Sequence, residues 1–272
     1  MWLIDLVGNF RPQILIVVAM VLTAALMLRL WKHAIAAVLV LVAGLYLALD
    51  IPIAPQASTG TGGLRLVGFN LKASDRNITA EIDWLLEGRF DVVALYEVTP
   101  AYAKQLERLS ARFPHSVVEP RATNYGMAVF SIHPLQNAQV FDPADAGVPA
   151  IRALLAAPQG GTEILVLHPP PPVGAHHAEW RNRYLDRIAY LAPLASNRVA
   201  IGDLNATPWS AALHKLRRFG GFSFASRFPP TTWPTRFFFP FTVAIDQALV
   251  AGNVQVAEIA RGPKLGSDHW PI

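Results

Sequence analysis

The sequence contains no cysteine. Disulfide bonds, thiolate zinc sites and cysteine nucleophiles are therefore excluded, and any metal ion must be held by oxygen and imidazole ligands. Charged residues are also scarce, at 15% of the chain, and the formal net charge is only +4. This balance permits an anionic substrate or a membrane surface as a partner, but it does not demand nucleic acid.

Hydrophobic residues make up 53% of the 272 residues, and the excess lies mostly at the N-terminus. Two apolar runs cover Ile14–Leu30 and Ala34–Leu49. At about 17 and about 16 residues, each is near the lower limit for a helix that spans a bilayer. Only the short segment Trp31–His33 separates them, which predicts a tight hairpin. We therefore expect residues 1–51 to form a membrane anchor of two transmembrane helices that contacts the lipid bilayer through residues 14–49, rather than a cleaved signal peptide or a buried helical hairpin.

The charges at the hairpin turn predict its orientation. Arg29 and Lys32 flank the turn, and the positive-inside rule places it in the cytoplasm. The chain is then a multi-pass protein of the cell membrane whose C-terminal domain faces the extracytoplasmic side. Residues 52–63 are rich in Pro, Ala, Ser, Thr and Gly and are expected to form a flexible linker. Residues 64–272 are long enough to form one domain with its own core.

Short apolar strands alternate with helical patterns beyond the linker. Helices are expected at 77–87, 102–113, 179–194 and 210–219, and strands at 64–70, 91–97, 126–131, 151–156, 163–168, 198–203, 245–250 and 253–259. This alternation, with hairpin-like strand pairs, predicts an α/β fold of mixed sheets covered by helices.

Polar side chains recur at the ends of the expected strands or close to them. The set is Asn70, Glu97, His168, Asp203, Asn205, Asp246, Asp268 and His269. Strand ends in α/β folds open into the loops where ligands bind. Carboxylate oxygens hold Mg²⁺, an imidazole or carboxylate orients water, and amide and imidazole donors neutralise charge on phosphate oxygens. Together, these groups are what hydrolysis of a phosphoester needs.

Each member of the set also has a structural alternative when it is taken alone. Glu97 would also serve as a cap or an ion-pair partner, and His168 as a buried imidazole that a carbonyl satisfies. The Gly-Asp-x-Asn motif at 202–205 is also a common turn, and Asp268-His269 alone is compatible with an exposed loop. Their joint occurrence, in this order at strand ends, favours the catalytic interpretation.

The ordered motifs resemble the endonuclease/exonuclease/phosphatase superfamily over residues 64–272. They are Asn70, Tyr96-Glu97, Tyr125–Ser131, Leu167-His168, Gly202–Asn205, Ile245-Asp246 and Ser267–His269. The preceding helices and the His-Pro-Pro-Pro-Pro run at 168–172 resemble a bacterial membrane-bound branch of that group. The resemblance implies a four-layer sandwich, in which two mixed β-sheets pack face to face and helices lie outside.

The resemblance also implies a metal site and a substrate contact. Glu97 is the principal Mg²⁺ ligand, with Asn70 and Asp268 nearby, and Mn²⁺ is an alternative metal. Tyr125 is a further contact to the phosphate of the substrate.

By the same resemblance, five residues carry the reaction. Asp246 orients His269, which acts on the attacking water or on the phosphate. Asp203 positions or activates the water, and Asn205 and His168 hold phosphate oxygens. Water attacks directly, without a phosphoenzyme.

The shared catalytic set does not choose among the substrates of the family. The phosphodiester can belong to nucleic acid, to a lipid headgroup or to a small molecule, and phosphomonoesters are a further option. A second class of function is a non-catalytic, membrane-tethered binding protein on the same fold, although a complete set of acids and histidines argues against it. The sequence indicates no protein partner.

The sequence also predicts the placement of two further groups of residues, one aromatic and one basic. Trp233 and Phe237–Phe239 are expected either to form an apolar wall of the cleft, to dip into a membrane, or to pack in the core or a loop. Arg181, Arg183 and Arg187 are expected on a solvated helix face.

Overall fold

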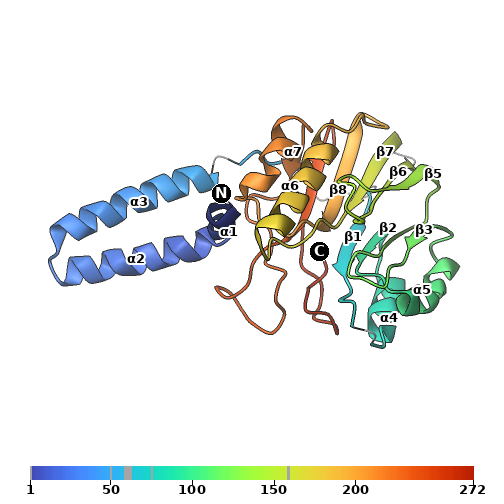
Figure 1. Cartoon of the computed structure of the whole chain (residues 1–272), viewed down its shortest axis with the longest axis horizontal. Helices are drawn as coiled ribbons and strands as arrows, with labels where there is room; N and C mark the ends of the chain where they lie inside the picture. The colour runs from blue at the N-terminus through green and yellow to red at the C-terminus, as the bar shows by residue number, and fades with distance from the viewer. Residues whose placement is uncertain (1, 50, 58–62, 75, 158–159) are drawn as a thin grey trace.

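Two of the three N-terminal helices project from the rest of the molecule as a hairpin (Figure 1). The computed structural model describes residues 2–49, 51–57, 63–74, 76–157 and 160–272. It begins with α1 (Trp2–Gly8), α2 (Arg11–Met27) and α3 (Trp31–Leu49). By length and composition, α3 alone is apolar enough to cross a membrane. Helices α1 and α2 meet the same criterion only as a pair, and they are bent by 71° relative to each other.

Two mixed β-sheets form the centre of the remaining chain. The smaller has the order β1-β2-β4-β3, from β1 (Leu66–Asn70), β2 (Val92–Tyr96), β3 (His115–Glu119) and β4 (Met127–Ser131). The larger has the order β5-β6-β7-β8-β10-β9, from β5 (Leu135–Phe141), β6 (Ala150–Ala157), β7 (Gly160–Leu167), β8 (Asn197–Asp203), β9 (Ser223–Phe224) and β10 (Asp246–Ala251). The parallel pairs are β1/β2 and β7/β8.

Helices cover the outer face of each sheet. The smaller sheet carries α4 (Thr79–Glu87), α5 (Pro100–Leu106) and a 3₁₀ turn at Glu107–Ala111. The larger sheet carries α6 (Ala175–Ala189), a 3₁₀ turn at Ala211–Leu213 and α7 (His214–Arg218). Strand β2 shows how the layers are built. Its side chains alternate, so that Val93 and Leu95 pack under the helices whereas Val92, Ala94 and Tyr96 pack against the other sheet. The predicted four-layer sandwich is confirmed.

The prediction of a strand at 253–259 is wrong. Among the described residues, this segment makes a single isolated bridge, from Val256 to Gln56. Val254 and Val256 still pack against the core between the sheets, which explains the alternating pattern, but no further strand lies beside them to extend the ladder.

The first half of the expected linker lies against the larger sheet. Ala54 N donates to Phe224 O at 2.8 Å, and Phe224 N donates to Pro52 O at 3.1 Å. Ile51 and Ala54 are buried. Residues 51–57 therefore add an extended segment at the β9 edge, whereas residues 58–62 lie outside the described part of the chain.

Candidate active site

Four strands bring the predicted polar residues together. Asp203 ends β8 and Asp246 begins β10, and the two are directly opposed in the antiparallel ladder. Asn70 ends β1, and Glu97 directly follows β2, which runs parallel to β1. The two sheets face each other, so these four side chains converge at one end of the sandwich.

His269 and Asp246 form a buried pair. The two atoms His269 Nδ1 and Asp246 Oδ2 are 2.9 Å apart. His269 is held from behind, because its backbone N–H donates to Ser267 Oγ at 3.0 Å and Ser267 Oγ donates to the carbonyl of Asn70 at 2.6 Å. The imidazole is therefore fixed in position, and its Nε2 is directed toward Asp203, 3.7 Å from Oδ2.

Asp203 connects the other members of the site. Its Oδ2 accepts a hydrogen bond from Asn70 Nδ2 at 3.0 Å and lies 3.7 Å from the Nε2 atoms of both His168 and His269. Its Oδ1 accepts from the backbone N–H of Asn205 at 3.0 Å. Burial, together with the nearby Asp246, raises the pKa of Asp203, against the opposing effect of the two imidazoles.

Glu97 and Asn70 lie side by side. Glu97 adopts a left-handed backbone conformation, with φ of 59°, that a glutamate rarely takes. Its two carboxylate oxygens accept hydrogen bonds from Asn70 Nδ2 at 3.1 Å and from Ala73 N at 2.7 Å. The side-chain oxygen of Asn70 accepts from Lys72 N at 2.9 Å. Asn70 therefore presents its amide nitrogen to the acids, and its role as a metal ligand stays a prediction.

The two imidazoles have opposite electrostatic environments. Burial lowers the pKa of His168, although Asp203 opposes the effect. Burial alone would also lower the pKa of His269, but Asp246 and Asp203 outweigh it and raise the pKa to about 9. At neutral pH one imidazole is therefore neutral and the other is cationic, in the same site.

These groups meet at an open pocket of about 700 Å³. Seven of the nine predicted site residues line it, namely Glu97, Tyr125, His168, Asp203, Asn205, Asp268 and His269. Asn70 and Asp246 lie behind them and hold them by hydrogen bonds. Trp233 also lines the pocket, so the structure bears out the apolar wall as one of the alternatives for this residue.

The acids outnumber the cations in this site, which fits a bound metal ion. Glu97, Asp203, Asp246 and Asp268 are balanced by one cationic imidazole, and no described residue that lines the pocket is Lys or Arg. Ligand atoms of Asp203, Asp246 and His269 lie within 4.8 Å of one another, but a cationic imidazole cannot bind a metal ion, so the carboxylates are the candidate metal-binding groups of this site. Asp246 Oδ1 is buried and has no hydrogen-bond partner in the described chain. Oxygen donors of this kind suit a hard divalent cation.

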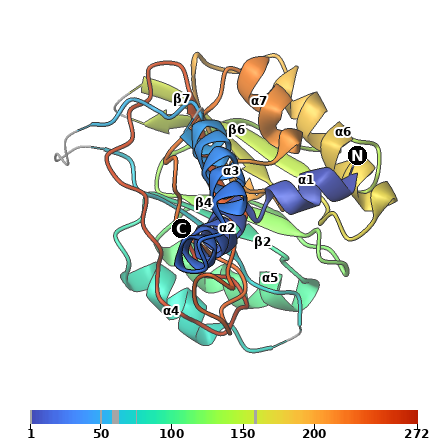
Figure 2. The ribbon, with the colours of Figure 1, turned by 90° about the vertical axis from the view of Figure 1, so that its left-hand side faces the viewer.

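The N-terminal segment forms part of the same pocket, which the sequence reasoning missed. Leu6, Asn9 and Phe10 line it. Figure 2, which looks along the hairpin, shows α1 lying across the domain toward α6. Asn9 Oδ1 accepts from the backbone N–H and the hydroxyl of Thr207, at 2.8 and 3.0 Å.

A buried ion pair links α1 to the loop that follows β8. The guanidinium of Arg181 donates to the carboxylate of Asp5 and to the carbonyl of Asn205. Arg181 is 0% exposed, so its expected place on a solvated helix face is wrong, whereas Arg183 and Arg187 are exposed. The signal was present in the sequence. Arg181 shares the helix face of Tyr184, Leu185 and Ile188, all of which are buried.

The chain belongs to the endonuclease/exonuclease/phosphatase family, whose sequence model matches residues 65–269. Solved structures share the fold at low identity. TDP2 from D. rerio, complexed with a single-stranded DNA product, is 15% identical with a TM-score of 0.59, over 76% of this chain and 96% of that chain. A family protein from Leptotrichia buccalis is 17% identical with a TM-score of 0.62, over 77% and 97%. Beta toxin from Staphylococcus aureus is 15% identical with a TM-score of 0.56, over 77% and 98%. No curated protein matches the chain.

Proposed function

We propose that this protein is a membrane-anchored, metal-dependent phosphoesterase that hydrolyses phosphodiester bonds, or phosphomonoester bonds, by direct attack of water. The observation that carries the proposal is the convergence of four acids and two imidazoles, from widely separated chain segments, on one open pocket. Membership of the family supports a hydrolytic reaction.

The His269–Asp246 pair and Asp203 divide the reaction between them. As an imidazolium, His269 donates a hydrogen bond to a phosphate oxygen as negative charge develops there, and Asp246 fixes the ring. The raised pKa makes Asp203 a better acceptor for a proton from the attacking water than an exposed aspartate would be.

The opposite side of the pocket positions the substrate. His168 is neutral and donates from one ring nitrogen to a phosphate oxygen, and the side-chain amide of Asn205 does the same. The Tyr125 ring lines the pocket, 5.9 Å from that of His168, centroid to centroid, which supports a phosphate contact by Tyr125.

Mg²⁺ is the proposed cofactor, with Mn²⁺ as the alternative. Glu97 and Asp268 would hold the ion, together with Asn70 if its amide oxygen turns toward the site. A bound divalent ion would neutralise negative charge on the phosphate as a Lewis acid. An anionic substrate entering a pocket with an excess of acids needs such neutralisation.

The neighbours support a phosphodiester substrate without fixing its class. The D. rerio TDP2 structure holds a single-stranded DNA product. Nucleic acid, lipid headgroups and small phosphodiesters are all included in the proposal, and the catalytic residues alone do not select among them.

The helical hairpin supports the membrane anchor, proposed here as residues 1–51 ahead of a catalytic domain at 64–272. Helices α2 and α3 have 17 and 19 residues, or about 26 and 28 Å at the α-helical rise, close to the roughly 30 Å hydrocarbon core of a bilayer. Apolar side chains are exposed on both helices. Because α1 docks on the catalytic domain through Asp5 and Asn9, the N-terminus and that domain lie on the same side, as a hairpin that crosses twice requires.

The test is an assay of the full chain in detergent micelles with Mg²⁺ or Mn²⁺. The substrates are DNA, RNA, sphingomyelin and bis-p-nitrophenyl phosphate. Hydrolysis that a chelator abolishes and added metal restores is the expected result. A folded protein that binds Mn²⁺ but cleaves none of these substrates would favour the alternative, a membrane-tethered binding protein.

A further inference from the structure

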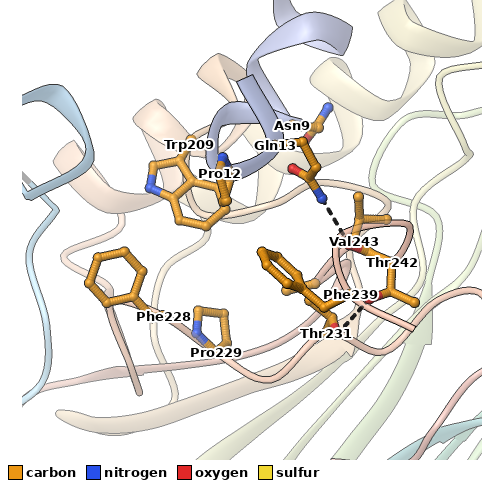
Figure 3. Close-up of a pocket in the computed structure, with 11 residues that line it drawn as sticks. Asn9, Pro12, Gln13, Trp209, Phe228, Pro229, Thr231, Phe239, Thr242 and Val243 are labelled. Carbon is orange, nitrogen blue, oxygen red and sulfur yellow. Dashed lines mark hydrogen bonds between the residues drawn. The ribbon is translucent and has the colours of Figure 1, made fainter. Parts of the chain in front are cut away.

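A second cavity lies where α2 leaves the catalytic domain (Figure 3). Its volume is about 350 Å³. Pro12 and Gln13, in the first turn of α2, form one wall, and Trp209, Phe228 and Phe239 surround the rest. Seven of the eleven lining residues are Ala, Val, Pro, Phe or Trp. The size is within the range of small-molecule sites.

Most polar groups around this cavity are already engaged. Gln13 Nε2 donates to the carbonyls of Pro240 and Thr242, both at 3.0 Å. Thr242 Oγ1 donates to Thr231 Oγ1 at 2.9 Å. Two buried atoms, Gln13 Oε1 and Trp209 Nε1, have no hydrogen-bond partner among the described residues. The cavity therefore suits an apolar chain that carries few hydrogen-bonding groups.

The cavity adjoins the catalytic pocket. Asn9 and Val243 line both of them. The two pockets therefore share part of their wall, so that an apolar chain between α2 and Trp209 would lie close to a phosphate beside His269.

A cluster of exposed aromatic residues marks the same face of the molecule. Phe237, Phe238, Phe239 and Phe241 are exposed by 45%, 76%, 49% and 65%. The hydrogen bonds of Gln13 tie this loop to the start of α2. Such a cluster is unfavourable in water but suits the interface of a bilayer, where aromatic side chains concentrate. If this cluster lies at the interface, the mouth of the cavity would be close to the lipid.

We infer that the cavity between α2 and the catalytic domain is an acyl-chain subsite, and that the substrate is a phospholipid drawn from the bilayer. The inference rests on the proposed function for the chemical step. Water adds to phosphorus, one P–O ester bond breaks, and the proton lost by water passes to the leaving alkoxide. The products are one alcohol and one phosphomonoester.

Photo-crosslinking tests the subsite without requiring turnover. The full chain is reconstituted in phosphatidylcholine vesicles that contain phosphatidylcholine with a diazirine in its acyl chain, and labelled peptides are mapped by mass spectrometry. We expect labels on the peptides that contain Trp209 and Phe228–Phe239. Phe228→Glu and Phe239→Glu should each lower this labelling by at least about tenfold, because they place a charge in an apolar cavity.

Phe219→Glu is the matched control. Phe219 is 51% exposed, stacks on Tyr190 and lines neither pocket, so labelling should be unchanged. The same variants are assayed on phosphatidylcholine and on bis-p-nitrophenyl phosphate, and only hydrolysis of the lipid should fall. Labelling confined to the outer faces of α2 and α3 would overturn the subsite, whatever the activity. Labelling of the cavity without hydrolysis of any phosphoester would support the subsite and overturn both the proposed function and the phospholipid as its substrate.

Discussion

Two buried imidazoles, His168 and His269, lie in one pocket and differ in charge. Both lose water on folding, which disfavours the charged form of each. Only His269 gains a direct carboxylate partner, Asp246 at 2.9 Å, whereas His168 is 3.7 Å from Asp203. The difference follows from strand register, because β10 begins at Asp246 beside the end of β8. A neutral donor and a cationic donor are thereby available to one phosphate group.

The His269–Asp246 pair is predicted to act as a unit. His269→Ala should lower kcat by about 10²–10⁴-fold and change KM much less. Asp246→Asn should be milder, and the double variant should lose much less than the sum of the two effects.

The test measures steady-state kcat and KM of the variants on any diester that the wild type cleaves, with circular dichroism to exclude misfolding. His214→Ala, an exposed histidine at the start of α7, is the control. A folded His269→Ala protein that keeps more than about a third of kcat would contradict the mechanism.

Glu97 is predicted to carry the metal dependence. Glu97→Gln removes one negative charge and keeps an oxygen that can accept from Ala73 N. The Mg²⁺ concentration for half-maximal activity should rise by at least about tenfold. The stabilisation by Mn²⁺, measured as a rise in Tm, should shrink as well. Glu87→Gln, on the exposed side of α4, should leave both quantities unchanged, and an unaltered metal dependence in Glu97→Gln would remove Glu97 from the site.

Much of the candidate site could be predicted from the sequence, because Asn70, Glu97, His168, Asp203 and Asp246 lie at or next to the ends of strands whose apolar patterns are clear. The orientation of the Asn70 amide could not be, since it depends on Lys72 N and on two acids from other strands. Arg181 was misplaced because a lone arginine on a helix is usually solvated. Its burial depends on Asp5, a contact across 176 positions in the chain.

At the scale of elements, α1 holds the loop that follows β8 in place through hydrogen bonds. Asp5 accepts from Ser210 Oγ at 2.7 Å and from Ala211 N at 2.6 Å, in addition to its ion pair with Arg181. Asn9 holds Thr207 in the same loop. The loop begins at the Gly-Asp-x-Asn motif, so the N-terminal helix positions part of the proposed active site.

Asp5→Ala is predicted to destabilise the protein strongly. It leaves the guanidinium of Arg181, 1% exposed, without its carboxylate, at a cost of about 3–5 kcal/mol. The Tm should fall by about 6–20 °C for a domain of this size, and Asp5→Ala/Arg181→Met should recover most of the loss. Asp83→Ala, which breaks an ion pair about half-exposed on both sides, should change Tm little. A Tm for Asp5→Ala equal to that of Asp83→Ala would show that Asp5 does not hold Arg181.

The elements that the sequence did not predict are the short or exposed ones. Strands β3 and β5 lie at sheet edges, and most residues of β5 are exposed, so neither shows a buried apolar run. Strand β9 has only two residues. Helix α1 is short and depends on Asp5 and Asn9 for its docking, which periodicity alone does not reveal. Strands with two buried faces, such as β2, were placed within a residue or two.

At the scale of the whole molecule, the proposed anchor and the proposed active site lie on the same side. The apolar cavity, the aromatic residues 237–241 and the start of α2 all lie on the side from which the hairpin projects. An anchor that only tethered the domain would not need to line its pocket with Leu6, Asn9 and Phe10. The geometry therefore favours a site that works at the membrane surface.

The orientation of that surface gives the last prediction. With Arg29 and Lys32 at the hairpin turn, the turn should stay in the cytoplasm and the domain should face outward. Alkaline phosphatase fused at Gly62 should be active, and green fluorescent protein fused there should be dark. Arg29→Glu/Lys32→Glu should weaken or reverse this pattern, because it removes the basic residues at the turn. In a second pair of fusions, placed after Ile272 so that α6 is present, Arg183→Glu/Arg187→Glu on the exposed face of α6 should leave the pattern unchanged, since charges far from the spans contribute little. Fluorescent, phosphatase-negative cells with the wild-type hairpin would overturn the proposed topology.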